Sequence, residues 1–336
     1  MSKARGKPVR FSNANGKSGA KASLPNGKPT ATSAAQTGNE TGDAPAEKLH
    51  AALTTAAPPY SAHYAPTQDL STSKKMSDLL PRAASSLVLM ALALGSVWLG
   101  GEAFSVIWLA AAFAIVYEWQ SIIATARLLP RILIAGLALV LAGQFASKGS
   151  PGFASYIIAL GGVFAASTAG QGRRIWAFAG LAYAGALLVS VTALYHSAAF
   201  GAGFILWLFA TVWGTDVFAY FGGRMIGGPK LWPQISPSKT WSGTLLGVFA
   251  GALIGSAVGF GGIGHSIATP QLFGLGLLTA LVSQGGDLFE SWVKRYFGVK
   301  DSSVLIPGHG GFMDRLDGFA AAAACAALVA ASRHML

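Results

Sequence analysis

Residues 175–195 read IWAFAGLAYAGALLVSVTALY and contain no charged side chain over 21 positions. An α-helix of about 20 apolar residues is long enough to cross the hydrocarbon core of a bilayer. The whole chain has a similar composition, because 52% of its residues are hydrophobic and only 11% are charged. A soluble domain is about a quarter charged. The sequence therefore predicts a polytopic membrane protein and argues against a soluble enzyme.

Apolar runs alternate with short polar or glycine-rich breaks from residue 83 to the carboxyl end. Several runs are shorter than the roughly 20 residues of a perpendicular span, so we expect some helices to extend into the polar flanks. This pattern predicts an all-α bundle of about nine transmembrane helices. The runs cover residues 83–100, 103–119, 132–146, 154–169, 175–195, 204–221, 244–259, 272–283 and 318–331.

The first 75 residues differ from the rest of the chain. They contain ten Lys or Arg and four acidic residues, and Ser, Ala, Gly, Thr, Pro and Asn dominate them. Because such a segment has no apolar period that could bury a core, residues 1–75 are predicted to be a disordered basic tail. Met76 offers an alternative translation start. The remainder divides into N-terminal transmembrane helices, 76–203, and a C-terminal catalytic transmembrane region with cytoplasmic loops, 204–336.

Lys and Arg side chains are distributed unevenly between alternate loops. With the amino terminus inside, twelve basic side chains after the tail lie on the inner side, and only Lys148 and Arg333 lie on the outer side. Cytoplasmic loops collect Lys and Arg, so we expect an odd number of spans with the amino terminus in the cytoplasm. A bacterial inner membrane is the expected location. The net charge of +11 is explained by this distribution, and we expect no nucleic-acid partner.

Acidic residues gather in the last third of the chain, on the predicted cytoplasmic side. Charged groups next to apolar spans are costly, so such a group predicts a functional site. Carboxylates that converge from separate helices suit Mg²⁺, because substrate phosphates and water complete its octahedron. The alternative is ordinary ion pairing, for example of Glu290 with Lys294 one helical turn later. The six residues are Asp216, Asp287, Glu290, Asp301, Asp314 and Asp317.

Two glycine-rich loops accompany these acids. Residues 308–311 precede Asp314 and can present backbone amides to an anion. Residues 222–230 lead to the polar segment 235–241, whose Lys239 and hydroxyl groups suit phosphate oxygens. The hydroxyl groups are equally compatible with helix capping, and His309 with a structural hydrogen bond. Glu118, at the inner end of the second apolar run, leaves both a site role and a structural role open.

The segment from residue 291 to 317, SWVKRYFGVKDSSVLIPGHGGFMDRLD, resembles the signature of phosphatidate cytidylyltransferases, also called CDP-diacylglycerol synthases. Every fixed position of that signature is filled. Residues 216–223, DVFAYFGG, resemble the family's D-x-x-A-Y-x-x-G segment, and residues 236–243, SPSKTWSG, resemble its S-P-K-K-T-x-E-G box. In this box Ser238 replaces the usual Lys and Ser242 the usual Glu, so one cation and one carboxylate are missing and only Lys239 keeps its charge role.

The resemblance implies transfer of a cytidylyl group from CTP to phosphatidic acid in a lipid bilayer, with Mg²⁺ and with a homodimer as the assembly. The lipid phosphate is already anionic near neutral pH, so the reaction mainly needs charge neutralisation and alignment. The expected ligands of one or two cations are Asp287, Asp314, Asp317 and Asp216. The expected catalytic residues are Asp287, Asp314, Asp317, Lys294 and Arg315, and the expected substrate contacts are Ser236, Lys239, Thr240, Ser291, Arg295, His309, Gly310 and Gly311.

Three other functions stay open at this point. A transporter or channel would place its polar groups near the middle of the membrane. A cytidylyltransferase for another lipid phosphate would use the same chemistry, and an inactive relative would bind without turnover. A CDP-alcohol phosphotransferase needs D-G-x-x-A-R, whose Arg is missing from residues 317–322. The chain also lacks G-x-x-x-x-G-K-[ST], H-E-x-x-H and a cysteine zinc cluster, which argues against a soluble-type ATPase or a zinc protease.

Overall fold

The computed structural model describes residues 79–123, 127–262, 269–306 and 310–336. The predicted tail, residues 1–75, lies outside the described residues. Within them the chain forms nine α-helices and one two-stranded hairpin. The elements are α3 (Leu79–Leu99), α4 (Gly101–Ile122), α5 (Leu128–Ser147), α6 (Pro151–Ser167), α7 (Arg174–His196), α8 (Gly201–Met225), β1 (Lys230–Trp232), β2 (Ser236–Thr240), α9 (Trp241–Gly262), α10 (Thr269–Tyr296) and α11 (Met313–Ser332).

Each predicted apolar run corresponds to one of these helices, which confirms the all-α membrane bundle. Seven of the described helices are long and apolar enough to cross a membrane, and α3 and α6 contribute shorter apolar stretches. The predicted ends are less accurate. The run 272–283 belongs to α10, which continues to Tyr296, and the run 318–331 belongs to α11, which begins at Met313. Both extensions contain the polar residues of the site, which face other parts of the protein.

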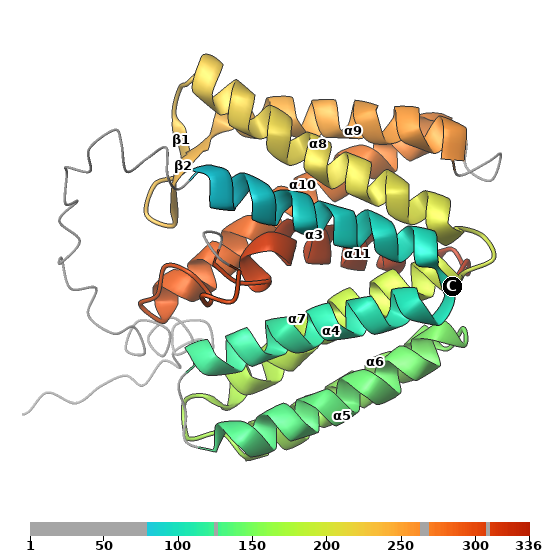
Figure 1. Ribbon diagram of the computed structural model, residues 1–336. Helices are drawn as coiled ribbons and strands as arrows, with labels where there is room; N and C mark the ends of the chain where they lie inside the picture. The colour runs from blue at the N-terminus through green and yellow to red at the C-terminus, as the bar shows by residue number, and fades with distance from the viewer. Residues whose placement is uncertain (1–78, 124–126, 263–268, 307–309) are drawn as a thin grey trace, which may run out of the picture. The chain divides into compact units, whose positions relative to one another are not determined.

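Helix α7 lies at the centre of this bundle. It contacts α4, α5, α6, α8 and α11, and most of its residues are buried. In Figure 1, α5 and α6 lie side by side below α7, and the α8–α9 pair covers the opposite side. Helices α10 and α11 pack against each other between these two layers. Helices α10 and α11 thus connect the two layers, because α11 packs on α7 and α10 packs on the α8–α9 pair.

Close packing of α8 and α9 depends on glycines at every fourth position of α9. A Cβ atom on Gly247 would lie 2.6 Å from the carbonyl oxygen of Thr215, and one on Gly251 would lie 2.6 Å from that of Thr211. Small residues at this spacing let two membrane helices approach closely. This contact fixes α8, and with it Asp216, against the helix that follows the hairpin.

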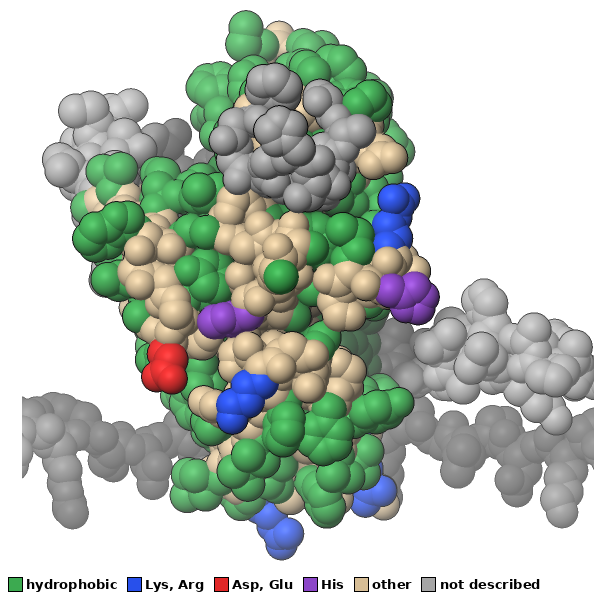
Figure 2. Space-filling view, turned by 90° about the vertical axis from the view of Figure 1, so that its right-hand side faces the viewer, with side chains coloured by type: hydrophobic (Ala, Val, Ile, Leu, Met, Phe, Trp, Pro, Cys, Tyr) green, Lys and Arg blue, Asp and Glu red, His purple; other side chains and the backbone are tan. Residues whose placement is uncertain are grey.

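The outer faces of the helices are apolar. Leu129, Leu133 and Leu137, one helical turn apart on α5, are 67%, 64% and 62% exposed. An exposed apolar stripe on a long helix is typical of a surface that contacts lipid chains. Figure 2 views the bundle from the end where the C-terminus lies, and few charged side chains are visible on that face.

The hairpin forms where the sequence predicted a polar loop. Lys230 lies opposite Thr240, and Trp232 lies opposite Ser236 in the antiparallel pair. Because successive helices alternate in direction, the hairpin, the last turns of α10 and the first turn of α11 share one end of the bundle, and the C-terminus lies at the other (Figure 1). We call the end of the bundle that contains β1 and β2 the hairpin end. The loops that follow α4, α6, α8 and α10 are all at this end, and together with the helix turns next to them they carry most of the basic residues of the described chain.

Candidate active site

The last three turns of α10 carry polar side chains inside an otherwise apolar helix. Gln284, Asp287 and Ser291 follow one another at spacings of three and four residues, so they lie on one face. Glu290 and Lys294 lie on the adjacent face, and both are buried. Helix α10 therefore contributes to two polar groups, each completed by a different part of the chain.

Asp314, in the first turn of α11, is at the centre of the first group. Its Oδ1 atom lies 2.5 Å from Nζ of Lys294. Its Oδ2 atom accepts hydrogen bonds from the backbone N–H and the hydroxyl of Ser302, at 2.9 and 2.8 Å, and from the N–H of Gly311 at 2.8 Å. This one carboxylate thus connects the end of α10, the segment that follows it and the start of α11.

Lys294 has a second carboxylate partner. Its Nζ atom lies 2.7 Å from Oε2 of Glu290 one turn earlier, which confirms the predicted i,i+4 pair. Glu290 is only 1% exposed, and its Oε1 atom accepts no hydrogen bond from the described residues. A buried ammonium group is costly unless it is paired. The two carboxylates therefore fix the position of the Lys294 side chain beside the signature segment.

Lys239, near the end of β2, completes the second group. Its Nζ atom lies 2.7 Å from Oδ2 of Asp287 and donates to Oε1 of Gln284 at 3.1 Å. Nε2 of Gln284 donates to Oδ1 of Asp216 on α8 at 3.2 Å, and the Ser291 hydroxyl donates to Oδ1 of Asp287 at 3.4 Å. The hairpin, α8 and α10 therefore meet around the ion pair of Lys239 and Asp287.

The acidic residues provide a donor set suited to a hard cation. Among the residues that the structure describes, no three His, Cys, Asp or Glu side chains converge closely enough to hold a metal ion by themselves. Asp216, Asp287 and Asp317 nevertheless lie near enough for their charges to interact with one another and with Lys239. Mg²⁺ is usually held by one or two carboxylates together with substrate phosphates and water. The carboxylates fit a site of that kind, and the individual metal ligands stay a prediction.

Two of the predicted substrate contacts have structural roles in and after the hairpin. The hydroxyl of Thr240 accepts the N–H of Gly243 at 3.1 Å, which caps the start of α9. Ser236 lies in β2 and is paired within the hairpin. Ser242, which replaces the family's Glu, donates its hydroxyl to the carbonyl oxygen of Gly227. This departure from the family pattern thus has a local function in holding the loop before β1.

The remaining predicted residues lie around the signature segment. Arg295 donates to the carbonyl oxygen of Val299 at 3.0 Å, and Arg315 is exposed on the first turn of α11. Gly310 has a φ of 80°, a conformation that favours glycine. His309 lies outside the described residues, so its acid–base role stays a prediction.

Two polar residues of this region were not among the expected site residues. Gln284 connects Asp216 with Lys239, and its spacing of three residues from Asp287 was a signal that could have identified it. Glu118 on α4 is buried and accepts a hydrogen bond from Ser302, which is 184 residues later in the chain. No local spacing could have predicted that contact.

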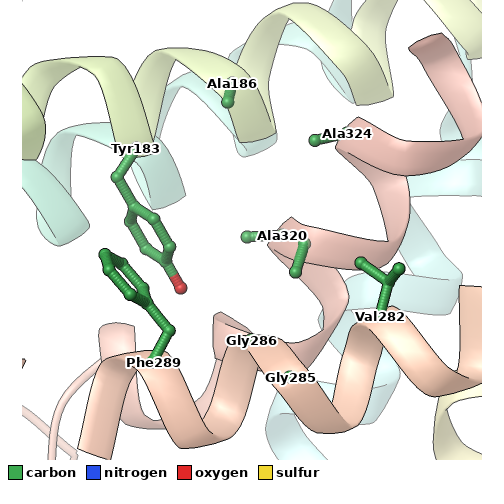
Figure 3. A pocket seen from close by; sticks show the side chains of 9 residues that line it. Tyr183, Ala186, Val282, Gly285, Gly286, Phe289, Ala320 and Ala324 are labelled. Atoms are coloured by element: carbon green, nitrogen blue, oxygen red, sulfur yellow. The ribbon is translucent and has the colours of Figure 1, made fainter. Parts of the chain in front are cut away.

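An apolar cavity of about 410 Å³ lies next to the polar groups. Figure 3 shows Tyr183 and Ala186 of α7 on one side, with Gly285, Gly286 and Phe289 of α10 opposite them. Helix α11 lines the rest of the cavity with alanine side chains at positions 320, 321 and 324. The cavity thus begins within one turn of Asp287 and Asp317 and is lined almost entirely by apolar atoms.

The chain is similar over most of its length to known cytidylyltransferases. A model of the cytidylyltransferase family matches residues 80–332. Phosphatidate cytidylyltransferases of Brucella abortus (strain 2308) and Brucella suis biovar 1 (strain 1330) are each 41% identical over 259 residues, which are 74% of this chain and 92% of the relative. The enzyme of that name from Staphylococcus aureus (strain COL) is 43% identical over 125 residues, 37% of this chain and 48% of the relative. This chain therefore belongs to the cytidylyltransferase family.

Proposed function

We propose that the protein is a membrane phosphatidate cytidylyltransferase, which transfers a cytidylyl group from CTP to phosphatidic acid in phospholipid biosynthesis. The observation that carries this proposal is the arrangement of the signature residues. Lys294, Ser302, Gly311 and Asp314 form one hydrogen-bonded group, and Lys239 and Asp287 form a second beside it. The similarity to relatives that bear this name over 92% of their length supports the same assignment.

The reaction forms one phosphorus–oxygen bond and breaks another. A phosphate oxygen of phosphatidic acid attacks the α-phosphorus of CTP, the bond from that phosphorus to the bridging oxygen of the β-phosphate breaks, and pyrophosphate leaves. The attacking oxygen is anionic near neutral pH, so no side chain has to remove a proton from it. Catalysis then depends on aligning the two phosphates and stabilising the charge that develops.

The chain provides cationic and amide donors for this purpose. We assign Lys239, Lys294, Arg295 and Arg315 to the phosphates of CTP and of the lipid, and the backbone amides at Gly310 and Gly311 to close approach of an anion. The amide of Gly311 donates to Asp314, so an anion would have to replace that carboxylate as its acceptor. An arriving phosphate oxygen would compete with Asp287 for Lys239, because Oδ2 of Asp287 lies 2.7 Å from Nζ of Lys239. Substrate binding would thereby release a carboxylate beside the phosphates.

Asp287, Asp314, Asp317 and Asp216 are the side chains that we propose to hold Mg²⁺ and a second cation. Magnesium supplies positive charge to the triphosphate and to the departing pyrophosphate. Asp287 would place that charge next to Lys239, where the hairpin meets α10, and Asp314 would place it next to Lys294. Substrate phosphates and water would complete the coordination, because no three of the described carboxylates converge closely enough to hold the ion by themselves.

The apolar cavity between α7, α10 and α11 suits an acyl chain of the lipid substrate. It lies beside Asp287 and Asp317, is lined by glycine, alanine and aromatic side chains, and belongs to helices that cross the membrane. A lipid whose phosphate reaches the polar groups would place its glycerol and first methylene groups at the same depth as this cavity. This arrangement favours a lipid phosphate acceptor.

We further propose that the hairpin end faces the cytoplasm of a bacterium, with the protein in the inner membrane. The basic loops gather at this end, as the positive-inside rule requires, and CTP is a cytosolic nucleotide. A homodimer is proposed from the family resemblance. We propose that the positive charge, +11 in total, interacts with anionic lipids and with substrate phosphates, and that the protein has no nucleic-acid partner.

The decisive experiment measures incorporation of labelled CTP into extractable lipid by the purified protein in detergent. Phosphatidic acid and Mg²⁺ are supplied together. In parallel reactions a chelator replaces Mg²⁺, or lysophosphatidic acid or ceramide phosphate replaces phosphatidic acid. Formation of labelled CDP-diacylglycerol and pyrophosphate in equal amounts, only with phosphatidic acid and Mg²⁺, is the expected result.

Other outcomes would identify a different function. Turnover with another lipid phosphate alone would change the substrate, and turnover in the chelator would remove the metal assignment. Folded protein that binds CTP without turnover of any lipid would be a non-catalytic relative. Flux of a solute across sealed vesicles without lipid turnover would establish a transporter.

A further inference from the structure

Glu118 connects the amino-terminal half of the bundle to the signature segment. It lies near the end of α4 and is completely buried. Its Oε1 atom accepts the hydroxyl of Ser303 at 2.7 Å and the N–H of Phe312 at 2.9 Å. Its Oε2 atom accepts the N–H of Met313 at 2.7 Å and the hydroxyl of Ser302 at 3.1 Å. Each oxygen atom of this carboxylate thus faces one backbone N–H and one hydroxyl, and the single proton of the Ser302 hydroxyl is shared with Asp314.

A buried carboxylate needs such donors, because its desolvation is otherwise costly. Among the described residues, the ion pairs of this region involve Lys239 and Lys294, and neither includes Glu118. Two of its four donors are the first backbone N–H groups of α11, which have no acceptor within their own helix. The positive end of the helix dipole also favours a negative charge at this place. Glu118 therefore acts as the cap of α11, supplied from another helix.

The four donors come from both ends of one loop. Ser302 and Ser303 follow α10, Phe312 directly precedes α11 and Met313 begins it, so Glu118 fixes the distance between the two ends of the intervening segment. This segment contains the glycines expected to approach a phosphate. The residues on either side of it, Ser302 and Ser303 before and Phe312 and Met313 after, are thus held by a residue of α4.

The same contacts lead directly to the first polar group of the site. The hydroxyl of Ser302 lies 3.1 Å from Oε2 of Glu118 and 2.8 Å from Oδ2 of Asp314. Asp314 in turn pairs with Lys294. A Cβ atom on Gly311 would overlap with both Glu118 and Ser302, so the loop packs tightly against the carboxylate.

We propose that Glu118 is a positioning residue for the cytidylyl transfer, holding the signature loop and Asp314 in the reactive arrangement without touching substrate. This inference rests on the proposed function and adds to it a requirement for the amino-terminal spans. A misplacement of about 1 Å in a catalytic arrangement can lower turnover by about a hundredfold.

The informative variant is E118Q, which keeps the size of the side chain. A glutamine has one acceptor oxygen and one NH₂ group, so it cannot accept all four donors. A serine hydroxyl can rotate and accept from the NH₂ group, but the backbone N–H of Phe312 or Met313 cannot. One amide at the start of α11 would therefore lose its acceptor, and the loop would shift while the fold is kept.

The test compares E118Q and E118D with E102Q, a substitution at the exposed far end of the same helix. Wild type and variants are purified in detergent, and thermal unfolding, kcat, KM for CTP and hydrogen exchange of the described residues 300–306 and 310–316 are measured. For E118Q we expect kcat to fall by about tenfold or more, KM for CTP to change less than about twofold, and exchange at the start of α11 to increase. E118D keeps the charge and should recover part of kcat, and E102Q should match wild type.

Three results would overturn the proposal. The first is an E118Q protein with the kcat and the hydrogen exchange of wild type. The second is a loss of kcat in E118Q and E118D that follows a loss of folded protein. The third is a loss of kcat in E102Q equal to that in E118Q. If the wild type itself does not turn over CTP with phosphatidic acid, the proposed function fails, and hydrogen exchange still decides about Glu118. Faster exchange at 310–316 in E118Q would then support a role in holding the loop, and unchanged exchange would refute it.

Discussion

Lys294 and Asp314 are 20 residues apart in the sequence and lie on the consecutive helices α10 and α11, and Nζ of the lysine lies 2.5 Å from Oδ1 of the aspartate. The lysine is positioned by Glu290 on its own helix, and the aspartate by Ser302 and Gly311 in the segment between the helices. The ion pair therefore depends on α10, α11 and the signature segment together. Several consequences of this dependence can be measured.

The substitutions D314N and K294M should be strongly non-additive. D314N leaves the buried Lys294 with Glu290 as its remaining carboxylate partner, and K294M removes the cation from both Asp314 and Glu290, so we expect each to lower kcat by at least about a hundredfold. The double variant should lose much less than the product of the two effects, because residues in one network are coupled. Turnover of labelled CTP in all four proteins measures the coupling. Independent effects in the double variant would contradict the shared role.

Lys239 should be required for turnover, whereas Lys230 should not. Both lie in the hairpin, but Lys239 pairs with Asp287, and Lys230 is exposed. We expect K239M to lower kcat/KM for CTP by about tenfold or more, because one charge-assisted contact to phosphate is lost. K230M is the matched control and should stay within about twofold of wild type. Equal effects of the two would show that only the net charge of the hairpin matters.

The substitution G311A should damage the site more than its small size suggests. A Cβ atom there would overlap with the Ser302 hydroxyl and the Glu118 carboxylate, so the loop must move. We expect loss of most turnover and a lower unfolding temperature. G274A is the control, because a Cβ atom on Gly274 of α10 meets nothing within 4 Å and alanine is the better helix former. It should be as stable as wild type or more stable.

Filling the apolar cavity should change the preference for acyl chains. A324L places a larger side chain in the space between α7, α10 and α11. If an acyl chain of phosphatidic acid occupies this space, KM should rise by about fivefold or more for long-chain substrate and little for a short-chain analogue. L328F, on the exposed face of the same helix, is the size control. Equal KM changes for both chain lengths would place the acyl chains elsewhere.

The orientation of the bundle can be tested with single cysteines. After replacement of Cys325, the only native cysteine, S238C would label the exposed hairpin and K148C the loop between α5 and α6. We expect a membrane-impermeant maleimide to modify S238C only in inverted vesicles and K148C only in right-side-out vesicles or intact spheroplasts. The opposite pattern would place the hairpin outside and exclude access to cytosolic CTP.

The sequence predicted the number of helices better than their ends. Each of the nine apolar runs is a helix of the described chain, because lipid-facing residues must be apolar whatever the details of packing. The run ending at residue 283 nevertheless misses more than three turns of α10, up to Tyr296. Polar residues in those turns face Lys239 and Asp314, and hydropathy cannot distinguish such partners from water.

The site was predictable as a group of residues but not as a set of pairs. The sequence places Asp287 and Glu290 in one acidic group, whereas in the structure Asp287 pairs with Lys239 and Glu290 with Lys294. The choice of partner depends on where β2 and α11 pack, and one helix contains no information about that. Glu118 illustrates the same limit, because its four donors lie more than 180 residues away.

The contact of α4 with the start of α11 has a consequence for dissecting this protein. A fragment that begins at residue 204 would contain every residue of the signature, yet it would leave the N–H groups of Phe312 and Met313 and the hydroxyl of Ser303 without their acceptor, and Ser302 would keep only Asp314. The amino-terminal spans are thus more than an anchor for a separable catalytic half. We expect activity from a chain cut in the loop after α7 only when both pieces are produced together and reassemble.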